Sequence, residues 1–286
     1  MKRIDFKTSL NLKNKIYIDV RSPGEFETDH IPGAINIPLL NNDERAIIGT
    51  IYKKEGGFNA RVKGVDIVSK KLVALVDKLI AETNEYQNIV FYCSRGGLRS
   101  LSMASFFKLV LDKPVYIIDK GYKDFRRYIV DYFEKFDFRG NFLVIDGFTG
   151  SGKTIILKKL QNKGLPVIDL ENLAKHRGSV FGGVGIEEKV SQKKFESLIW
   201  KSLTEIEENL IIVEGESKHI GKCLLPNKFY NLMNKSPHVW VETDDNVRLK
   251  IIKEDYLKNV KQLEQLIEPV KYLKRLIGKK LSLIHI

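Results

Sequence analysis

Cys93 lies in a segment whose composition indicates chemistry rather than packing. Residues 92–100 read YCSRGGLRS and directly follow the apolar run 89–92. The two glycines let the backbone turn so that several N–H groups can point at one anion, and a helix starting near residue 99 adds its positive end. Two arginines add fixed positive charge, which favours the thiolate and therefore a nucleophile. The residues predicted to act here are Cys93, Arg95 and Arg99, with Gly96 and Gly97 forming an anion cradle.

A second candidate site is the segment 147–154, GFTGSGKT, which is a complete GxxxxGK[ST] motif. It follows the apolar run 142–145 and precedes a helical pattern, which is the context that a phosphate-binding loop requires. Glycines expose backbone N–H groups to phosphate oxygens, a lysine neutralises charge, and a threonine can ligate Mg²⁺. The predicted phosphate-binding residues are Gly147, Gly150, Ser151, Gly152, Lys153 and Thr154, with Thr154 as the candidate Mg²⁺ ligand.

The ligand of this loop stays open at the level of sequence. ATP or GTP is the usual occupant, but a nucleotide hydrolase normally carries an Asp after a second apolar strand. Here the run 210–213 is followed by Glu214, which could substitute, and a diphosphate on another carrier would fit the same loop. Asp169 follows the run 166–168 and could be a base, an outer-sphere Mg²⁺ ligand or a helix cap.

Strands and helices alternate around both motifs, which predicts parallel βαβ units. The expected strands are 16–20, 34–38, 89–92, 115–118, 142–145, 166–169, 210–213 and 238–241. The expected helices are 65–82, 99–111, 153–162 and 195–206, the first with Val65, Val68, Leu72, Leu75, Val76 and Leu79 on one face. The sequence therefore predicts an α/β protein with two parallel-sheet domains, residues 1–139 and 140–245, followed by a basic helical region, 246–286.

Charge and cysteine content limit the function classes. The net charge of +12 is concentrated at the two ends of the chain: residues 1–139 and 246–286 each carry an excess of six positive charges, and 140–245 are balanced. A polyanionic partner is one interpretation, and a lysine-rich genome is the other. Two cysteines do not form a disulfide framework, and no apolar run reaches membrane-helix length, so a cytoplasmic protein is expected, with no membrane partner. Cys223, beside an apolar run, is expected to pack rather than react.

The first half of the chain resembles the rhodanese family. Residues 19–26, DVRSPGEF, and 30–38, HIPGAINIP, look like that family's signature, and they accompany the Cys93 loop. The resemblance implies that Asp19 and Arg21 brace the loop and that the cysteine carries sulfur as a persulfide. One departure matters, because Cys93 to Arg99 is a C-x5-R spacing, one residue longer than the common sulfurtransferase loop. That spacing also resembles dual-specificity phosphatases, and a larger loop could hold a larger anion such as selenophosphate.

The combination of both halves resembles the tRNA 2-selenouridine synthase family over about residues 12–260. The matching segments are 42–53, NDERAIIGTIYK, then 92–100, then 176–182, HRGSVFG, and 214–221, EGESKHIG. Candidate site residues follow from these segments and from Asp169, and they are Asp169, His176, Arg177, Glu214, Glu216 and Ser217. His176 and Arg177 could form a mobile phosphate clamp. The family's C-terminal helical region is longer, so this chain is expected to be shortened.

The resemblance implies an enzyme, a transferase that exchanges the sulfur of 2-thiouridine at the tRNA wobble position for selenium. The family first alkylates the sulfur with geranyl diphosphate and then uses selenophosphate. The partners implied are tRNA, small-molecule phosphates and a selenophosphate-supplying enzyme. Cys93 would carry or receive the chalcogen, Lys153 would stabilise the departing diphosphate, and the basic C-terminal region would bind tRNA, with Tyr256 and Tyr272 as candidate stacking residues.

Two other functions remain compatible with the residues. One is a C-x5-R phosphatase or sulfurtransferase with a regulatory nucleotide-binding domain, for which Asp119 and Asp124 are the nearest candidates for a general acid. The other is a P-loop switch whose rhodanese half only docks a partner. The intact Cys93 loop disfavours the second alternative, since a docking domain has no need of the thiol.

Overall fold

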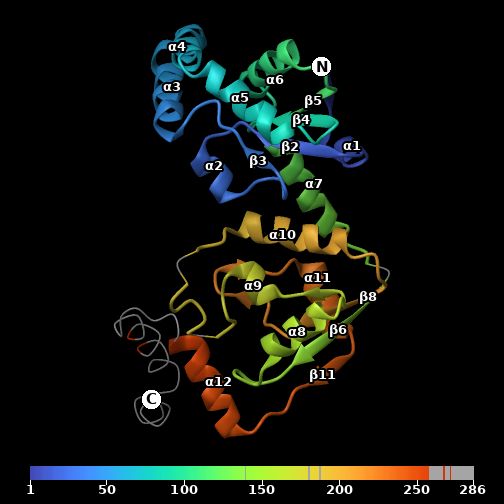
Figure 1. The fold of residues 1–286 in the computed structure, drawn as a ribbon. Helices are drawn as coiled ribbons and strands as arrows, with labels where there is room; N and C mark the ends of the chain where they lie inside the picture. Colours follow the sequence, from blue (N-terminus) through green and yellow to red (C-terminus); the bar gives the residue numbers. More distant parts are fainter. Residues whose placement is uncertain (139, 180, 187, 258–266, 268–270, 272–286) are drawn as a thin grey trace. The chain divides into compact units, whose positions relative to one another are not determined.

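The computed structural model describes residues 1–138, 140–179, 181–186 and 188–257, together with 267 and 271. The chain divides into two compact units, Met1–Tyr132 and Phe133–Ile286 (Figure 1). Each unit contains its own parallel sheet with helices between the strands, which confirms the predicted α/β class with two parallel-sheet domains. Among the described residues, none of the helices combines the length and the apolar character needed to cross a bilayer.

The first unit is a five-stranded sheet in which every neighbouring pair is parallel. Its order is β1-β5-β4-β2-β3, and the strands are β1 (Lys2–Ile4), β2 (Lys15–Asp19), β3 (Ile35–Asn36), β4 (Asn88–Tyr92) and β5 (Val115–Ile118). Strand β4 lies in the interior of the sheet between β2 and β5, and its end delivers Cys93. This position at the carboxyl ends of parallel strands is where α/β sheets bind ligands.

Seven helices accompany this sheet: α1 (Phe6–Leu10), α2 (Pro23–Thr28), α3 (Asn42–Glu55), α4 (Gly57–Ser69), α5 (Leu72–Thr83), α6 (Leu98–Val110) and α7 (Tyr122–Glu134), the last of which spans the division between units. Successive residues of β2 face opposite sides of the sheet. Ile18 belongs to the core cluster that includes Leu79 of α5 and Phe107 of α6. Tyr17 faces the other way and contacts Phe6 of α1, so helices cover both faces.

The single helix predicted over 65–82 is wrong. Helix α4 ends at Ser69 and α5 begins at Leu72, with a turn at Lys70–Lys71 closed by the Lys71 N–H bonding to the Val68 carbonyl. Val65, expected on the buried face, is 70% exposed. The apolar spacing continued across the turn by coincidence, because periodicity cannot show where one helix stops and another starts in a new direction.

The second unit has a four-stranded parallel sheet in the order β11-β6-β8-β7. Its strands are β6 (Asn141–Asp146), β7 (Val167–Ile168), β8 (Leu210–Glu214) and β11 (His238–Trp240), and an antiparallel pair is formed by β9 (His219–Ile220) and β10 (Cys223–Leu224). The helices are α8 (Lys153–Asn162), α9 (Leu170–Ala174), α10 (Gln192–Glu205), α11 (Asn227–Lys235) and α12 (Asp245–Leu257).

Side chains along β6 alternate between the two faces of the sheet, and each face packs against a different helix. Ile145 packs with Leu157 of α8, whereas Phe142 contacts Phe229 of α11 with ring centroids 5.0 Å apart. The carboxyl ends of β6, β7 and β8 carry the phosphate-binding loop, Asp169 and Glu214. Of the predicted basic region 246–286, the structure describes the helix as far as residue 257; Tyr272 and most of the other residues beyond it lie outside the described part of the chain.

Candidate functional site

Cys93 lies at the end of β4, buried, with 3% of its surface exposed. Its Sγ accepts a hydrogen bond from the backbone N–H of Gly97 at 3.2 Å and from the Ser100 hydroxyl at 3.3 Å. Both donors belong to the start of α6, so the loop and helix together direct dipoles at the sulfur. The anion cradle at Gly96 and Gly97 stays a prediction. Ser100, which is fully buried, was missed by the sequence analysis.

The Cys93 loop is fixed against the turn that follows β5. The Cys93 carbonyl accepts from the Tyr122 N–H at 2.8 Å, and the Ser94 carbonyl accepts from the Lys123 N–H at 3.2 Å. Gly121 has φ +57°, and a Cβ there would lie 2.0 Å from the Cys93 carbonyl oxygen. Only glycine can therefore occupy this position while the loop keeps its conformation.

Arg99 and Arg95 differ in their surroundings. Arg99 forms an ion pair with Glu25 at 2.7 Å and donates to the Ser94 hydroxyl at 2.8 Å. Burial alone would raise the pKa of Glu25, but the hydrogen bonds from Arg99 and Ser94 outweigh it and lower that pKa to about 2. Arg99 thus forms part of the loop wall, and its contact with a bound anion stays a prediction. Arg95 is exposed.

Asp19 and Arg21 form a buried pair beside the loop. The Arg21 Nε donates to Asp19 Oδ2 at 3.0 Å, and a terminal nitrogen donates to the same oxygen at 2.6 Å. The guanidinium also lies 4.0 Å from the ring centroid of Tyr122, whose N–H holds the Cys93 carbonyl. The pair therefore reaches the loop through Tyr122, and this contact is the physical route by which it can brace Cys93.

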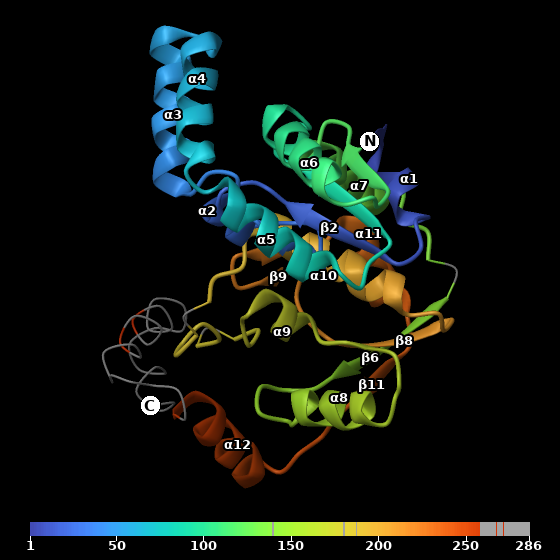
Figure 2. The same ribbon diagram turned by 45° about the horizontal axis from the view of Figure 1, so that its top comes forward.

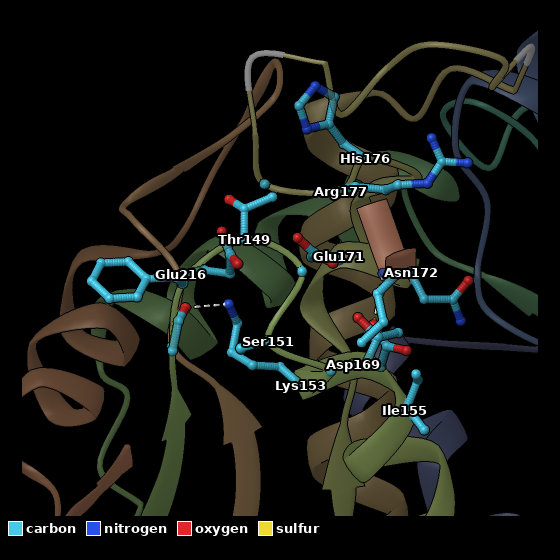
Figure 3. A pocket seen from close by; sticks show the side chains of 18 of the residues that line it. Thr149, Ser151, Lys153, Ile155, Asp169, Glu171, Asn172, His176, Arg177 and Glu216 are labelled. Carbon is cyan, nitrogen blue, oxygen red and sulfur yellow. Dashed lines mark hydrogen bonds between the residues drawn. The ribbon is translucent and has the colours of Figure 1, made fainter. Parts of the chain in front are cut away.

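In the second unit a cavity of about 640 Å³ opens beside the phosphate-binding loop (Figure 3). The Lys153 Nζ donates to the Gly147 carbonyl at 2.6 Å, so the lysine side chain closes back over the loop. The cavity is lined by most of the site residues predicted for the second unit: Gly147, Gly150, Ser151, Gly152, Lys153, Thr154, Asp169, His176, Arg177, Glu216 and Ser217. Sequence motifs about 70 residues apart thus converge on one cavity.

Asp169 acts as a helix cap. Its carboxylate accepts from the Asn172 N–H at 2.8 Å and thereby satisfies one free donor at the start of α9. This contact is the capping alternative among the three roles that the sequence left open. Because one carboxylate oxygen is enough for the cap, Asp169 also still lines the cavity.

Three carboxyl groups lie close together at the cavity, from Glu171 and Glu216, which line it, and from Glu214, with ligand atoms all within 4.8 Å of one another. Glu214 is fully buried, and one of its oxygens accepts from the Glu171 N–H while Oε2 has no hydrogen-bond partner among the described residues. Burial raises the pKa of Glu171 to about 8, and repulsion from Glu216 adds to this effect. The positive charge of Lys153 opposes the shift only in part. Burial also raises the pKa values of Glu214 and Glu216.

Crowded carboxylates with an unpartnered buried oxygen fit a hard divalent cation such as Mg²⁺, whose preferred ligands are oxygens. Glu171, Glu214 and Glu216 would hold it, and Thr154 lines the same cavity as the predicted additional ligand. Glu171 was missed by the sequence analysis, because an acidic residue in the first turn of a helix is expected for capping reasons alone. Glu214 does occupy the strand-end position where an Asp was expected.

The 176–178 segment lies directly over these carboxyls. A Cβ on Gly178 would be 2.5 Å from Glu216 Oε2 and 2.6 Å from Glu171 Oε1, so the backbone touches both side chains. The His176 Nδ1 has no hydrogen-bond partner among the described residues. Burial, followed by repulsion from Arg177, lowers the pKa of His176, so its imidazole is neutral at pH 7. The mobile phosphate clamp of His176 and Arg177 stays a prediction.

Helix α12 supplies a wall of the cavity that the sequence analysis did not anticipate. Ile251 and Ile252 line it, together with Ile155 and Ile186. The Arg248 guanidinium lies 4.9 Å from the Phe148 ring centroid, and its Nε donates to the Thr149 carbonyl at 3.4 Å. The cavity therefore combines a phosphate-binding end with aliphatic side chains.

Cys223 is buried in β10, with its Sγ 3.7 Å from the Val190 carbonyl. Burial, and to a lesser extent the charge of Glu196, raises the pKa of its thiol, which disfavours the reactive thiolate. The structure is thus consistent with the packing role expected for this residue.

Comparison with known proteins gives both halves a family. Residues 4–128 match the family described as rhodanese-like domain, and residues 140–276 match the tRNA 2-selenouridine synthase AAA domain. A curated relative named tRNA 2-selenouridine synthase, from Sulfurovum sp., is 34% identical over 94% of this chain and 73% of the relative. The chain belongs to the tRNA 2-selenouridine synthase family.

Other relatives of the same name have similar identity. The protein from Nitrosomonas europaea is 36% identical over 89% of this chain and 66% of its own length, and the one from Bdellovibrio bacteriovorus is 36% identical over 85% and 64%. The chain therefore spans about two thirds of the length of these members of the tRNA 2-selenouridine synthase family.

Proposed function

We propose that this protein replaces the sulfur of 2-thiouridine at the tRNA wobble position with selenium, by way of an S-geranylated nucleoside. Support comes from the family name that its relatives carry and from two sites with complementary chemistry. The observation that carries the proposal is the cavity of the second unit, where a phosphate-binding loop faces aliphatic side chains. A prenyl diphosphate has both a diphosphate and a hydrocarbon, so it would occupy both parts of this cavity.

In the first stage, the nucleoside sulfur attacks C1 of geranyl diphosphate. A sulfur–carbon bond forms, the carbon–oxygen bond to diphosphate breaks, and the base loses its N3 proton. Lys153 and the N–H groups of the loop would take the charge of the leaving diphosphate. The neutral imidazole of His176 lines the same cavity and could accept the proton, and Mg²⁺ on the glutamate cluster would supply further positive charge.

In the second stage, selenium from selenophosphate replaces the geranyl thiol at C2 of the base, and water takes the phosphoryl group to give phosphate. Alkylation has turned the sulfur into a good leaving group. We assign Cys93 to this stage. Its thiolate would attack phosphorus of selenophosphate, so that an S–P bond forms, the Se–P bond breaks and the selenide released attacks C2. Water would then hydrolyse the phosphocysteine to give phosphate and the free thiol. The hydrogen-bond donors of Gly97 and Ser100 would stabilise negative charge on the Cys93 sulfur. Arg95 belongs to the same loop and is exposed, so it could contact an incoming anion.

The proposal is tested by incubating the protein with 2-thiouridine tRNA, geranyl diphosphate and selenophosphate and analysing the nucleosides by mass spectrometry. We expect Lys153→Ala to slow geranylation by about 100-fold, since it removes one charge at the leaving group. Cys93→Ser should leave geranylation intact and block selenation, so that the geranylated nucleoside accumulates. Unmodified nucleosides from the folded wild-type protein would contradict the proposal.

The phosphatase alternative has weaker support. A C-x5-R phosphatase needs its arginine free to hold the phosphoryl group, and Arg99 here is paired with Glu25 and Ser94. A docking rhodanese domain needs no donors at the cysteine sulfur, yet two converge on Cys93. Loss of aryl phosphate hydrolysis in Cys93→Ser, or nucleotide-dependent partner binding without need of Cys93, would favour one of these alternatives instead.

A further inference from the structure

Helices α3 and α4 form a hairpin that contributes little to the core of the first unit. No residue of α3 is buried, and in α4 only Ala60 and Val68 are. The two helices lie side by side and extend away from the sheet (Figure 2). Ordering some 27 residues in this way costs conformational entropy that core burial does not recover here, which indicates that the hairpin has another use.

The far end of the hairpin presents aromatic and cationic side chains. Tyr52 at the end of α3 is 65% exposed, and Phe58 at the start of α4 is 69% exposed. A Cβ on Gly57 would lie 3.4 Å from the Tyr52 ring and 3.5 Å from the Arg61 guanidinium, so these two groups converge at the turn. The group comprising Tyr52, Lys53, Lys54, Phe58 and Arg61 is called the hairpin tip below.

The cations of the hairpin tip are unpaired, unlike those at its base. Lys63 and Lys70 pair with Asp66, and Lys71 pairs with Glu44. The side chains of Lys53, Lys54 and Arg61, by contrast, are exposed and make no ion pair or hydrogen bond with other described residues. The tip therefore holds three unpaired positive charges, which exceed the single exposed carboxylate of Glu55 beside them.

We propose that the hairpin tip is a docking surface for the tRNA substrate. This inference rests on the function proposed above and adds a contact that neither the cysteine loop nor the cavity provides. Lys53, Lys54 and Arg61 contact phosphates, and Tyr52 and Phe58 offer faces on which unpaired bases stack.

Charge complementarity favours RNA over a protein partner at this surface. Lysine is depleted from the centres of protein–protein interfaces because it is costly to desolvate, and two of the five residues of the tip are lysines. Exposed aromatic rings between cations are instead the usual composition of a surface that binds single-stranded nucleic acid. An anticodon loop, where the wobble base lies, is such a single-stranded segment.

The test compares three full-length proteins in binding titrations with 2-thiouridine tRNA between 50 and 300 mM salt. The first is wild type and the second is Lys53→Glu/Lys54→Glu/Arg61→Glu. The third, a matched control, is Lys7→Glu/Lys13→Glu/Lys78→Glu, which changes the same charge at exposed positions elsewhere on the unit. We expect the tip variant to bind at least tenfold more weakly, with the slope of log K against log salt flattened by about 2, and the control to lose much less.

The aromatic residues give a second measurement. Tyr52→Ala/Phe58→Ala should weaken binding by about tenfold and leave the salt slope unchanged, because stacking releases no counterions. In turnover assays both tip variants should raise KM for tRNA and leave kcat near the wild-type value.

The outcomes separate the two proposals. If wild type binds tRNA and the folded tip variant keeps its affinity and salt slope, the docking surface is wrong while the proposed function stands. If the tip variant changes only self-association, measured by sedimentation, the surface is a contact between copies instead. If wild type binds no tRNA, the proposed function fails, and the docking surface fails with it.

Discussion

The Cys93 loop and the phosphate cavity arrange their buried acids in opposite ways. In the first unit Asp19 faces Arg21 and Glu25 faces Arg99, and the pKa of Glu25 falls to about 2. In the second unit Glu171 lies against two other carboxyl groups, and its pKa rises to about 8. A loop whose charges are already compensated is preorganised for its chemistry, whereas the glutamate cluster would need a cation or a proton to compensate its charge.

The largest expected effect is on the stability of the first unit and comes from removing one partner of the buried Asp19–Arg21 pair. Arg21→Met leaves the Asp19 carboxylate buried and unpaired, and should destabilise the first unit by about 3–5 kcal/mol, measured by urea unfolding. The double variant Asp19→Leu/Arg21→Met removes both charges and should recover most of that loss. Equal destabilisation in the two variants would mean that packing on Tyr122, rather than charge pairing, explains the role of Arg21.

A pH series sharpens the comparison, since the two regions should respond in opposite directions. The folded-state pKa of Glu171 lies above its unfolded value near 4.5, so its contribution to stability is complete below pH 4.5 and is lost as pH rises through about 8. Glu25, with a folded pKa near 2, contributes stability above pH 4.5 that is lost as pH falls towards 2.

The measurement is thermal unfolding between pH 3 and 9 of wild type, Glu171→Gln and Glu25→Gln. In wild type we expect the loss of stability with rising pH to be on the order of 2 kcal/mol, and Glu171→Gln should reduce it. Mg²⁺ should reduce the same loss of stability in wild type. Glu25→Gln should flatten only the acid limb. An alkaline limb that is identical in wild type and Glu171→Gln would show that the glutamate cluster is not strained.

The smallest effect concerns the sulfur itself. Ser100→Ala removes one donor to Cys93 and should slow selenation about tenfold without changing geranylation, as expected for the loss of one hydrogen bond. Ser102→Ala, two residues further along α6, is the matched control. Equal rates in both variants would leave the Gly97 N–H as the donor that matters.

The two regions also differ in how far sequence could predict them. The cysteine loop, its glycines and the Asp19–Arg21 pair lie in short, recognisable segments, and the strand ends that carry them follow from apolar runs. Ser100 is the exception, because a serine in the first turn of a helix has no distinctive spacing. The phosphate-binding loop could be predicted for the same reason, because its motif lies in one short segment of the chain.

The rest of the cavity was not visible, because its parts are distant in the chain. The contacts of Gly178 with Glu171 and Glu216, and of α12 with the loop, depend on tertiary packing that periodicity does not encode. The hairpin α3–α4 was also missed, because its helices have few buried positions and therefore show little hydrophobic periodicity. Motifs could name His176 and Glu214, but neither Glu171 nor the burial that is the main cause of their pKa shifts.

The contact of Arg248 with Phe148 and Thr149 has a thermodynamic consequence. Helix α12 belongs to the basic end of the chain and at the same time forms a wall of the phosphate-binding cavity. Any partner that displaces or steadies α12 must change the affinity of the cavity for its ligand, and the ligand must change the affinity for that partner by the same factor.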